Sequence, residues 1–84
     1  MRRIGKVLHL TKSGELVLKS DSGFAPRIGD RAYGPDLREV GVISDVFGPV
    51  AAPYVAVRPL IDDPSRLVGQ ALYVRRRGRG WRRN

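Results

Sequence analysis

Few residues of this chain combine the types and spacing that enzyme chemistry requires. The 84 residues contain no cysteine and one histidine, His9, so a thiolate nucleophile and a disulfide are excluded and a zinc site lacks its usual ligands. Asp62 and Asp63 are adjacent acids, but they fall in a predicted turn, where aspartates commonly bond their own backbone. His9 lies in a predicted strand, and no serine is placed as its partner nucleophile. We therefore expect no enzymatic activity, no catalytic residues, no metal site and no cofactor.

The last ten residues carry the strongest charge signal. The chain has 16 Lys and Arg against 8 Asp and Glu, a formal charge of +8; residues 75–84 hold six arginines and no acid, which leaves 10 minus 8, or +2, for residues 1–74. Arginines mixed with glycine and an aromatic residue are typical of short RNA-binding arms, because the charge neutralises phosphates and the ring stacks on a base. The candidate RNA-binding residues are Arg75, Arg76, Arg77, Arg79, Trp81, Arg82 and Arg83. The alternative is a solubilising end with no specific ligand.

Residues 1–74 must supply the fold that positions any site. Ten valines and four isoleucines, with no helical-period run of useful length, favour strands over helices. The expected strands, separated by turns, are Arg3 to Leu10, Glu15 to Lys19, Arg31 to Tyr33, Arg38 to Phe47, Pro53 to Arg58 and Leu67 to Val74. About six short antiparallel strands predict an all-β domain, a small closed or nearly closed β-barrel over residues 1–74. Residues 75–84 are predicted to form a flexible tail.

The longest predicted strand, Arg38 to Phe47, is partly apolar on both faces. Strict alternation gives one face Val40, Val42, Ser44 and Val46, and the other Gly41, Ile43, Asp45 and Phe47. A barrel uses one face for its core, so Ile43 and Phe47 are expected either to be covered by a loop or to meet a partner. This holds unless a bulge near Gly41 or Gly48 resets the alternation.

The turn that follows this strand is apolar and stiff. Phe47, Val50 and Tyr54 flank a segment that Pro49 and Pro53 restrain, so little conformational entropy remains to be lost on binding. The candidate partner-binding residues are Ile43, Phe47, Gly48, Pro49, Val50, Pro53 and Tyr54. The alternative is that Phe47 and Tyr54 plug one end of the barrel core.

The same stretch resembles a known family. Its pattern is a Gly-x-Val/Ile strand that runs into Asp-x-Phe-Gly-Pro-Val and then Pro-Tyr-x-x-Val-Lys/Arg. All of these elements occur here in order, in the run from Val40 to Val50 and the run from Pro53 to Pro59, with Arg58 in the basic position. Leu8 to Leu10 and Gly29 to Gly34 also look like the family's flanking segments. Over most of residues 3–74, the chain resembles the Gar-type subunit of box H/ACA ribonucleoproteins.

This resemblance implies a small β-barrel related in shape to the barrel domains of translation factors. It also implies a non-catalytic accessory subunit that binds the catalytic domain of a dyskerin-type pseudouridine synthase in rRNA pseudouridylation. Such a subunit acts on a mobile loop of the synthase that grips substrate RNA, and so promotes substrate loading and product release. Contacts with the guide RNA and the other H/ACA proteins of the particle are expected to be mostly indirect.

The short basic end departs from the long glycine-arginine arms that flank the barrel in eukaryotic members. The resemblance is therefore to an archaeal member, with a cytoplasmic location, or a nucleolar one if the source is eukaryotic. The longest apolar stretch is far shorter than the roughly 18 residues of a membrane span, so no membrane partner is expected. The alternative function is a direct RNA-binding β-barrel of ribosomal or translation-factor type. The balanced charge of residues 1–74 favours the accessory subunit, and the arginine tail favours the alternative.

Overall fold

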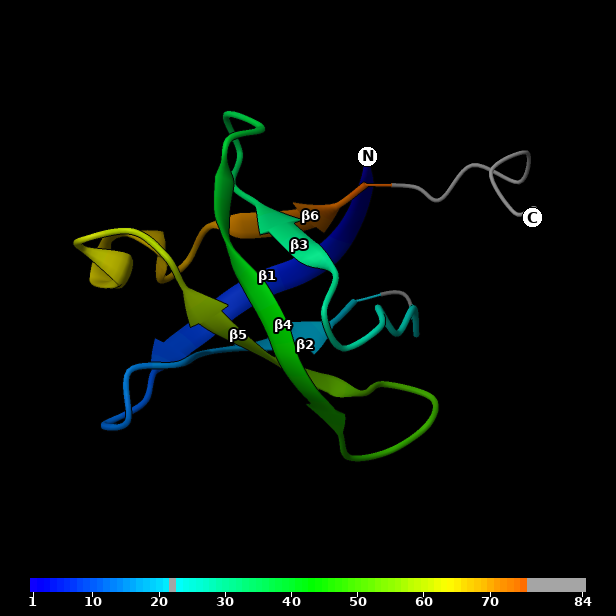
Figure 1. Ribbon diagram of the computed structural model, residues 1–84. Helices are drawn as coiled ribbons and strands as arrows, with labels where there is room; N and C mark the ends of the chain where they lie inside the picture. The colour runs from blue at the N-terminus through cyan, green and yellow to red at the C-terminus, as the bar shows by residue number, and fades with distance from the viewer. Residues whose placement is uncertain (22, 76–84) are drawn as a thin grey trace.

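Six antiparallel strands close into a barrel in the computed structural model, which describes residues 1–21 and 23–75 (Figure 1). The strands are β1 (Arg2–Leu10), β2 (Leu16–Ser20), β3 (Arg31–Tyr33), β4 (Glu39–Phe47), β5 (Tyr54–Pro59) and β6 (Ala71–Val74). Their order around the barrel is β1-β2-β5-β4-β3-β6. The predicted all-β class and closed antiparallel barrel are confirmed.

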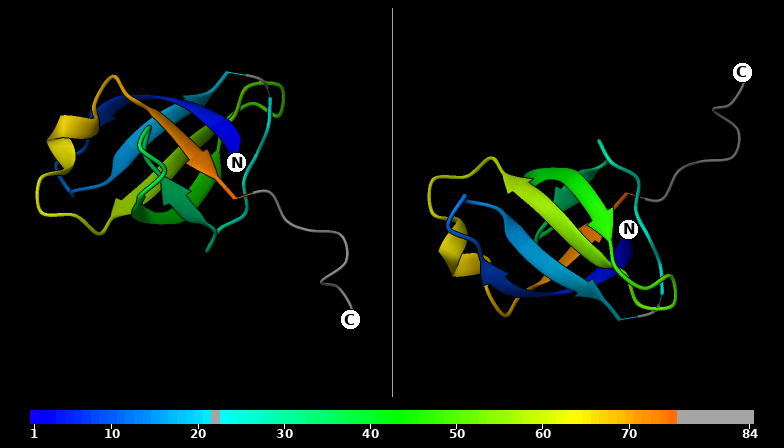
Figure 2. Two further views of the ribbon diagram at one scale, coloured as in Figure 1. Left: turned by 90° about the horizontal axis from the view of Figure 1, so that it is seen from above. Right: turned by 90° about the horizontal axis from the view of Figure 1, so that it is seen from below.

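Closure depends on β6, which joins the two halves of the sheet. β6 pairs with β1 through Arg2↔Val74 and Lys6↔Ala71, and with β3 through Ala32↔Val74. Every strand therefore has two hydrogen-bonded neighbours, as barrel closure requires. The views from above and below in Figure 2 both show the start of β1 lying close to the end of β6. The first and last strands are therefore neighbours in space.

The sixth strand is shorter than the sequence predicted. The expected strand from Leu67 to Val74 begins only at Ala71, because Pro64–Leu67 forms a 3₁₀ helix, η1. A proline in the first helical turn suits this start, since its missing N–H would be unpaired there anyway. The other five strands lie within one residue of their predicted bounds. Among residues 1–21 and 23–75, no helix has the length and apolarity to cross a membrane.

The core consists of aliphatic side chains from all six strands and from η1. Leu67 of η1 is 3% exposed and joins the same cluster as the strand residues. The cluster comprises Ile4, Val7, Leu16, Leu18, Ala32, Val40, Ile43, Val55, Val57, Leu67, Leu72 and Val74. Burying each of the larger side chains contributes roughly 1.5 to 3 kcal/mol, which makes this cluster the main source of stability.

β4 departs from simple alternation at two points. Opposite β3, Gly41 pairs with Ala32 and Glu39 with Tyr33, so one residue of β4 is extra there. Opposite β5, a second register shift falls between Ile43 and Asp45. Each extra residue makes a bulge that switches which face the following side chains occupy. The side chains of β4 between the two shifts therefore lie on the opposite face of the sheet from the one that strict alternation predicts.

As a result, Val40 and Ile43 both point into the core, at 3% and 1% exposure, although strict alternation puts them on opposite faces. The expectation that Ile43 lies on the outer face is wrong, and the bulge opposite β3, where Val40 is the extra residue, is the physical reason. Gly41 lies between them, where a Cβ atom would collide with the carbonyl oxygen of Arg58 and lie 2.8 Å from Val57 Cγ1. The close approach of β4 and β5 therefore requires glycine at this position.

Candidate functional site

The turn between β4 and β5, residues 47–54 and called here the β4–β5 turn, presents apolar side chains to solvent. Phe47, at the end of β4, is 45% exposed, and Val50 is 95% exposed. Gly48 and Pro49 are also exposed, and Tyr54 is partly buried. Because the Val50 side chain stays in water, it contributes almost no hydrophobic stabilisation to the fold of the isolated chain. The turn therefore has apolar surface available to a partner.

Hydrogen bonds and one special backbone conformation hold the turn in shape. Gly48 has a φ of +90°, which favours glycine, and a Cβ there would lie 3.0 Å from the Tyr54 ring. The N–H of Ala52 donates to the carbonyl of Pro49 at 3.2 Å. The N–H of Ser20, at the end of β2, donates to the carbonyl of Pro53 at 2.9 Å. The turn is thus fixed both internally and to the neighbouring strand.

Two aromatic rings stiffen the base of the turn. Phe47 and Tyr54 pair directly across β4 and β5, and their rings stack with centroids 5.7 Å apart and planes 20° apart. Lys19 of β2 places its Nζ 5.8 Å from the centroid of the Tyr54 ring. Neither aromatic residue belongs to the core cluster. The alternative that Phe47 plugs the barrel end disagrees with its exposure of 45%. The stack with Tyr54 fixes the Phe47 ring on the surface.

Two of the predicted partner-binding residues are not on the surface. Ile43 is 1% exposed inside the barrel, and Pro53 is also buried, with its carbonyl bonded to Ser20. Both positions are corrected from contact residues to structural residues. Phe47, Gly48, Pro49, Val50 and Tyr54 stay together in the β4–β5 turn, and their contact with a partner stays a prediction.

A shallow groove beside β4 is a second apolar surface, and sequence analysis missed it. The groove has a volume of about 270 Å³, and Ile28 and Leu60 at its rim are 65% and 56% exposed. Val42 of β4 lines it as well. Single apolar residues in loops give no periodic signal, and only the pairing of the loop with β4, through the Ile43 N–H and the Asp30 carbonyl at 2.8 Å, brings them together.

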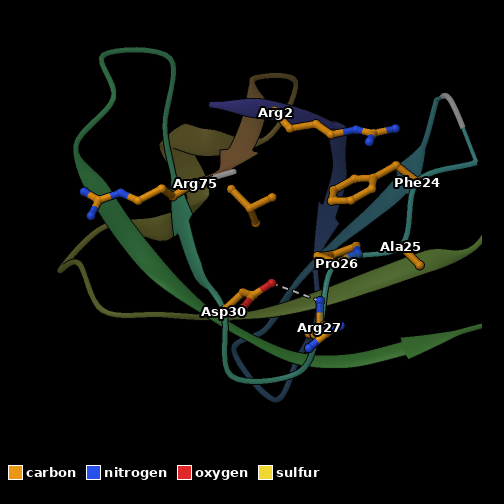
Figure 3. A pocket seen from close by; sticks show the side chains of 8 residues that line it. Arg2, Phe24, Ala25, Pro26, Arg27, Asp30 and Arg75 are labelled. Carbon is orange, nitrogen blue, oxygen red and sulfur yellow. Dashed lines mark hydrogen bonds between the residues drawn. The ribbon is translucent and has the colours of Figure 1, made fainter. Parts of the chain in front are cut away.

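A basic pocket lies where β1 starts and β6 ends (Figure 3). It has a volume of about 180 Å³ and is lined by Arg2, Phe24, Ala25, Pro26, Arg27, Asp30, Val74 and Arg75. Of the predicted tail residues, Arg75 is described, and its guanidinium lies 5.7 Å from the centroid of the Tyr33 ring. Arg76, Arg77, Arg79, Trp81, Arg82 and Arg83 lie outside the described residues. Sequence analysis missed Arg2 and Arg27, because only the closing of the barrel places them beside Arg75.

The acidic residues and the histidine do not gather into a reactive cluster. Asp63 accepts a hydrogen bond at 2.7 Å from the side-chain Oγ of Ser65, where the predicted turn implied a backbone partner, and His9 is exposed on β1. Within the described part of the chain, no group of three or more His, Cys, Asp or Glu residues could hold a metal ion. A hydrogen bond from Arg3 Nε to Asp21 at 2.8 Å, followed by charge attraction, raises the pKa of Arg3 above its ordinary value. Arg3 therefore stays charged at any physiological pH.

Comparisons with known proteins reveal a relative without a described function. No family model matches the chain. An uncharacterized protein of Methanothermobacter thermautotrophicus is 28% identical over 78 residues, which cover 88% of this chain and 83% of that protein.

Proposed function

We propose that this chain is a non-catalytic accessory subunit of a box H/ACA ribonucleoprotein. It binds the catalytic domain of a dyskerin-type pseudouridine synthase through the β4–β5 turn, and it promotes substrate RNA loading and product release. The resemblance of residues 40–59 to the Gar-type subunit suggests the partner. The observation that carries the proposal is that Phe47 and Val50, within this stretch, are 45% and 95% exposed on a restrained turn.

The chemistry of the turn suits a protein partner. Burying apolar surface stabilises a complex by roughly 25 cal/mol for each Å² removed from water, and Val50 and Phe47 have such surface to bury. Aromatic residues held in one conformation are frequent hot spots of protein interfaces. The hydrogen bonds of Ala52 and Ser20 already order the backbone, so binding costs less conformational entropy.

The proposed role is accessory rather than catalytic. In the part of the chain that the structure describes, Asp63 is engaged by Ser65 and His9 is exposed on a strand. In the proposal, the synthase carries out the isomerisation of uridine. A subunit that binds one conformation of the synthase's RNA-gripping loop more tightly shifts the loop toward that conformation. Loading and release then change without any contact between this chain and the reacting base.

The proposed source is archaeal, with a cytoplasmic complex. The relative that is 28% identical over 78 residues comes from an archaeal organism, which supports this assignment. The competing function, a direct RNA-binding barrel, is favoured by the basic pocket beside Arg75. Against it as the main role, residues 1–74 carry 10 basic and 8 acidic residues, or +2, which is low for a barrel that binds RNA over its whole surface.

Reconstitution with a dyskerin-type synthase and its guide RNA tests the proposal. We expect the full chain to co-elute with the synthase from a sizing column and to raise the multiple-turnover rate of pseudouridine formation more than the single-turnover rate. No pseudouridine should form with the chain alone. Absence of a complex at micromolar concentrations would contradict the proposal, and activity of the isolated chain would show that it is an enzyme.

A further inference from the structure

The basic pocket has an apolar floor that the proposed function leaves unused. Phe24 packs partly buried against the core, Pro26 is buried, and Val74 is 2% exposed. These side chains come from the segment before β3 and from β6, and barrel closure brings them together. At about 180 Å³ the pocket is smaller than the sites that hold drug-sized ligands, so it suits one small ring system.

Arginines form the rim of this floor. The guanidinium carbon of Arg2 lies 4.0 Å from the centroid of the Phe24 ring, so the charged group covers one face of this ring. Figure 3 shows Arg75 on the opposite side of the pocket from Phe24, and Arg27 below, next to Asp30. The Arg75 side chain points away from the pocket toward Tyr33, so Arg2 and Arg27 are the arginines closest to the apolar floor.

The backbone of Arg27 is held firmly at this rim. The N–H of Arg27 donates to Asp30 Oδ2 at 3.1 Å, and the N–H of Asp30 donates to the carbonyl of Arg27 at 3.0 Å. This reciprocal pair closes the loop that carries Arg27. Asp30 is the acidic residue among the lining residues, against three arginines, so the pocket has a surplus of positive charge.

We propose that this pocket binds one unpaired nucleotide of single-stranded RNA. The base packs on Phe24, the partly exposed residue of the apolar floor, and the neighbouring phosphates contact Arg2 and Arg27. Stacking on an aromatic ring and a guanidinium is the usual way to hold an unpaired base, and arginines pair with phosphates through parallel hydrogen bonds. Five further arginines follow Arg75 in residues 76–84, so the sequence directly after the pocket residue is also basic.

An acidic peptide fits the pocket less well. Its carboxylates satisfy the arginines, but no flat apolar group accompanies them to cover Phe24, Pro26 and Val74. A nucleotide supplies the ring and the negative charge together. This site is separate from the β4–β5 turn, so the inference stands or fails independently of binding to the synthase.

Binding of a fluorescein-labelled uridine hexamer RNA, followed by anisotropy, tests the assignment. The variant Arg2→Ser/Arg27→Ser removes two charges at the pocket, and Arg38→Ser/Arg66→Ser removes two charges outside the pocket lining. We expect the first pair to weaken binding by at least tenfold and the second by less than threefold. Equal weakening by both pairs of substitutions would mean that RNA binds through general charge attraction, and it would contradict the assignment of the pocket as the RNA site.

Two further measurements keep the test independent of folding defects. In the unmodified chain, the RNA should shift the amide resonances of Phe24, Arg27 and Val74, whereas shifts confined to residues 76–84 would contradict the proposal. Phe24→Leu keeps the apolar bulk but removes the ring, so a roughly fivefold or greater loss of affinity is expected. A glutamate hexamer should leave those amides unmoved, and if it shifts them as the RNA does, the pocket recognises acidic chains instead.

Discussion

The β4–β5 turn and the basic pocket are neighbouring surfaces with opposite chemistry. The backbone of Gly23, next to Phe24 of the pocket, approaches the carbonyl of Ala51 in the turn, where an added Cβ would lie 3.1 Å from that oxygen. The turn exposes Val50 and Phe47. The pocket surrounds an apolar floor with Arg2 and Arg27. One small barrel therefore presents a mainly apolar surface beside a basic one.

The difference indicates that the two surfaces bind by different forces. Binding through the turn removes apolar area from water, which depends little on ionic strength. Binding through the pocket replaces counterions around phosphates, which depends strongly on it. A partner protein and an RNA can therefore occupy adjacent sites on this chain without competing for the same residues. The two sites can therefore be separated by mutation and by ionic strength.

Ile43→Ala should have the largest effect, because it removes part of the hydrophobic core. Ile43 is 1% exposed, and shortening a buried isoleucine to alanine costs about 2 to 5 kcal/mol of unfolding free energy. Urea unfolding followed by circular dichroism measures this loss. If the variant kept the parent's stability and lost only synthase binding, Ile43 would be a surface contact and the bulges of β4 would be misplaced.

Phe47→Ser should weaken synthase binding through the β4–β5 turn and leave the basic pocket unaffected. Loss of an aromatic hot spot costs about 2 kcal/mol of binding, or roughly thirtyfold in Kd for the synthase, whereas unfolding loses only about 1 kcal/mol through the stack with Tyr54. Affinity for the uridine hexamer should not change. Leu8→Ser is the matched control, since Leu8 is 48% exposed on β1, and it should bind the synthase as the parent does. Unfolding of the Phe47 variant would instead place this ring in the core.

Ionic strength should separate the two sites without any mutation. With about three phosphates neutralised, raising salt from about 50 to 200 mM weakens RNA binding by about tenfold or more. The synthase complex should change by less than about threefold over the same range. Calorimetric titrations at both salt concentrations measure the two responses. Equal salt dependence would mean that both partners use the arginines.

Arg31→Ser should have the smallest effect and sets the baseline for surface changes. The ion pair of Arg31 with Glu39 is solvent-exposed, with 58% and 39% of the two side chains accessible, and exposed pairs contribute about 0.2 to 1 kcal/mol. Stability should fall within that range, and both affinities should stay within about twofold. A larger loss of RNA affinity would extend the basic site across β3.

The sequence predicts the barrel well because its strands are local patterns. Valine-rich segments between glycine and proline turns place five strands within one residue of their observed bounds. Bulges are not local patterns, because they depend on how β4 meets β3 and β5, so the positions of Val40 and Ile43 could not be assigned by alternation. The 3₁₀ helix at Pro64 was missed for a similar reason, since four residues before a strand read equally well as a loop.

The candidate site was predictable in part. The resemblance and the prolines drew attention to residues 47–54, and Phe47 and Val50 are exposed there. The burial of Pro53 depends on β2, whose Ser20 N–H meets the proline carbonyl. The basic pocket depends on the pairing of Arg2 with Val74, residues from opposite ends of the barrel sequence. Contacts between segments so far apart leave no trace in composition or spacing.

Whether the β4–β5 turn binds the synthase can be tested by mapping the amide resonances of the isotope-labelled chain in complex with an unlabelled dyskerin-type synthase. The account predicts that the largest changes fall on Phe47, Gly48, Val50 and Tyr54, while Ile28 and Leu60 of the groove stay close to their free positions. Changes centred on Ile28 and Leu60, or a spectrum that the synthase leaves unaltered, would contradict the assignment of the β4–β5 turn as the synthase-binding surface.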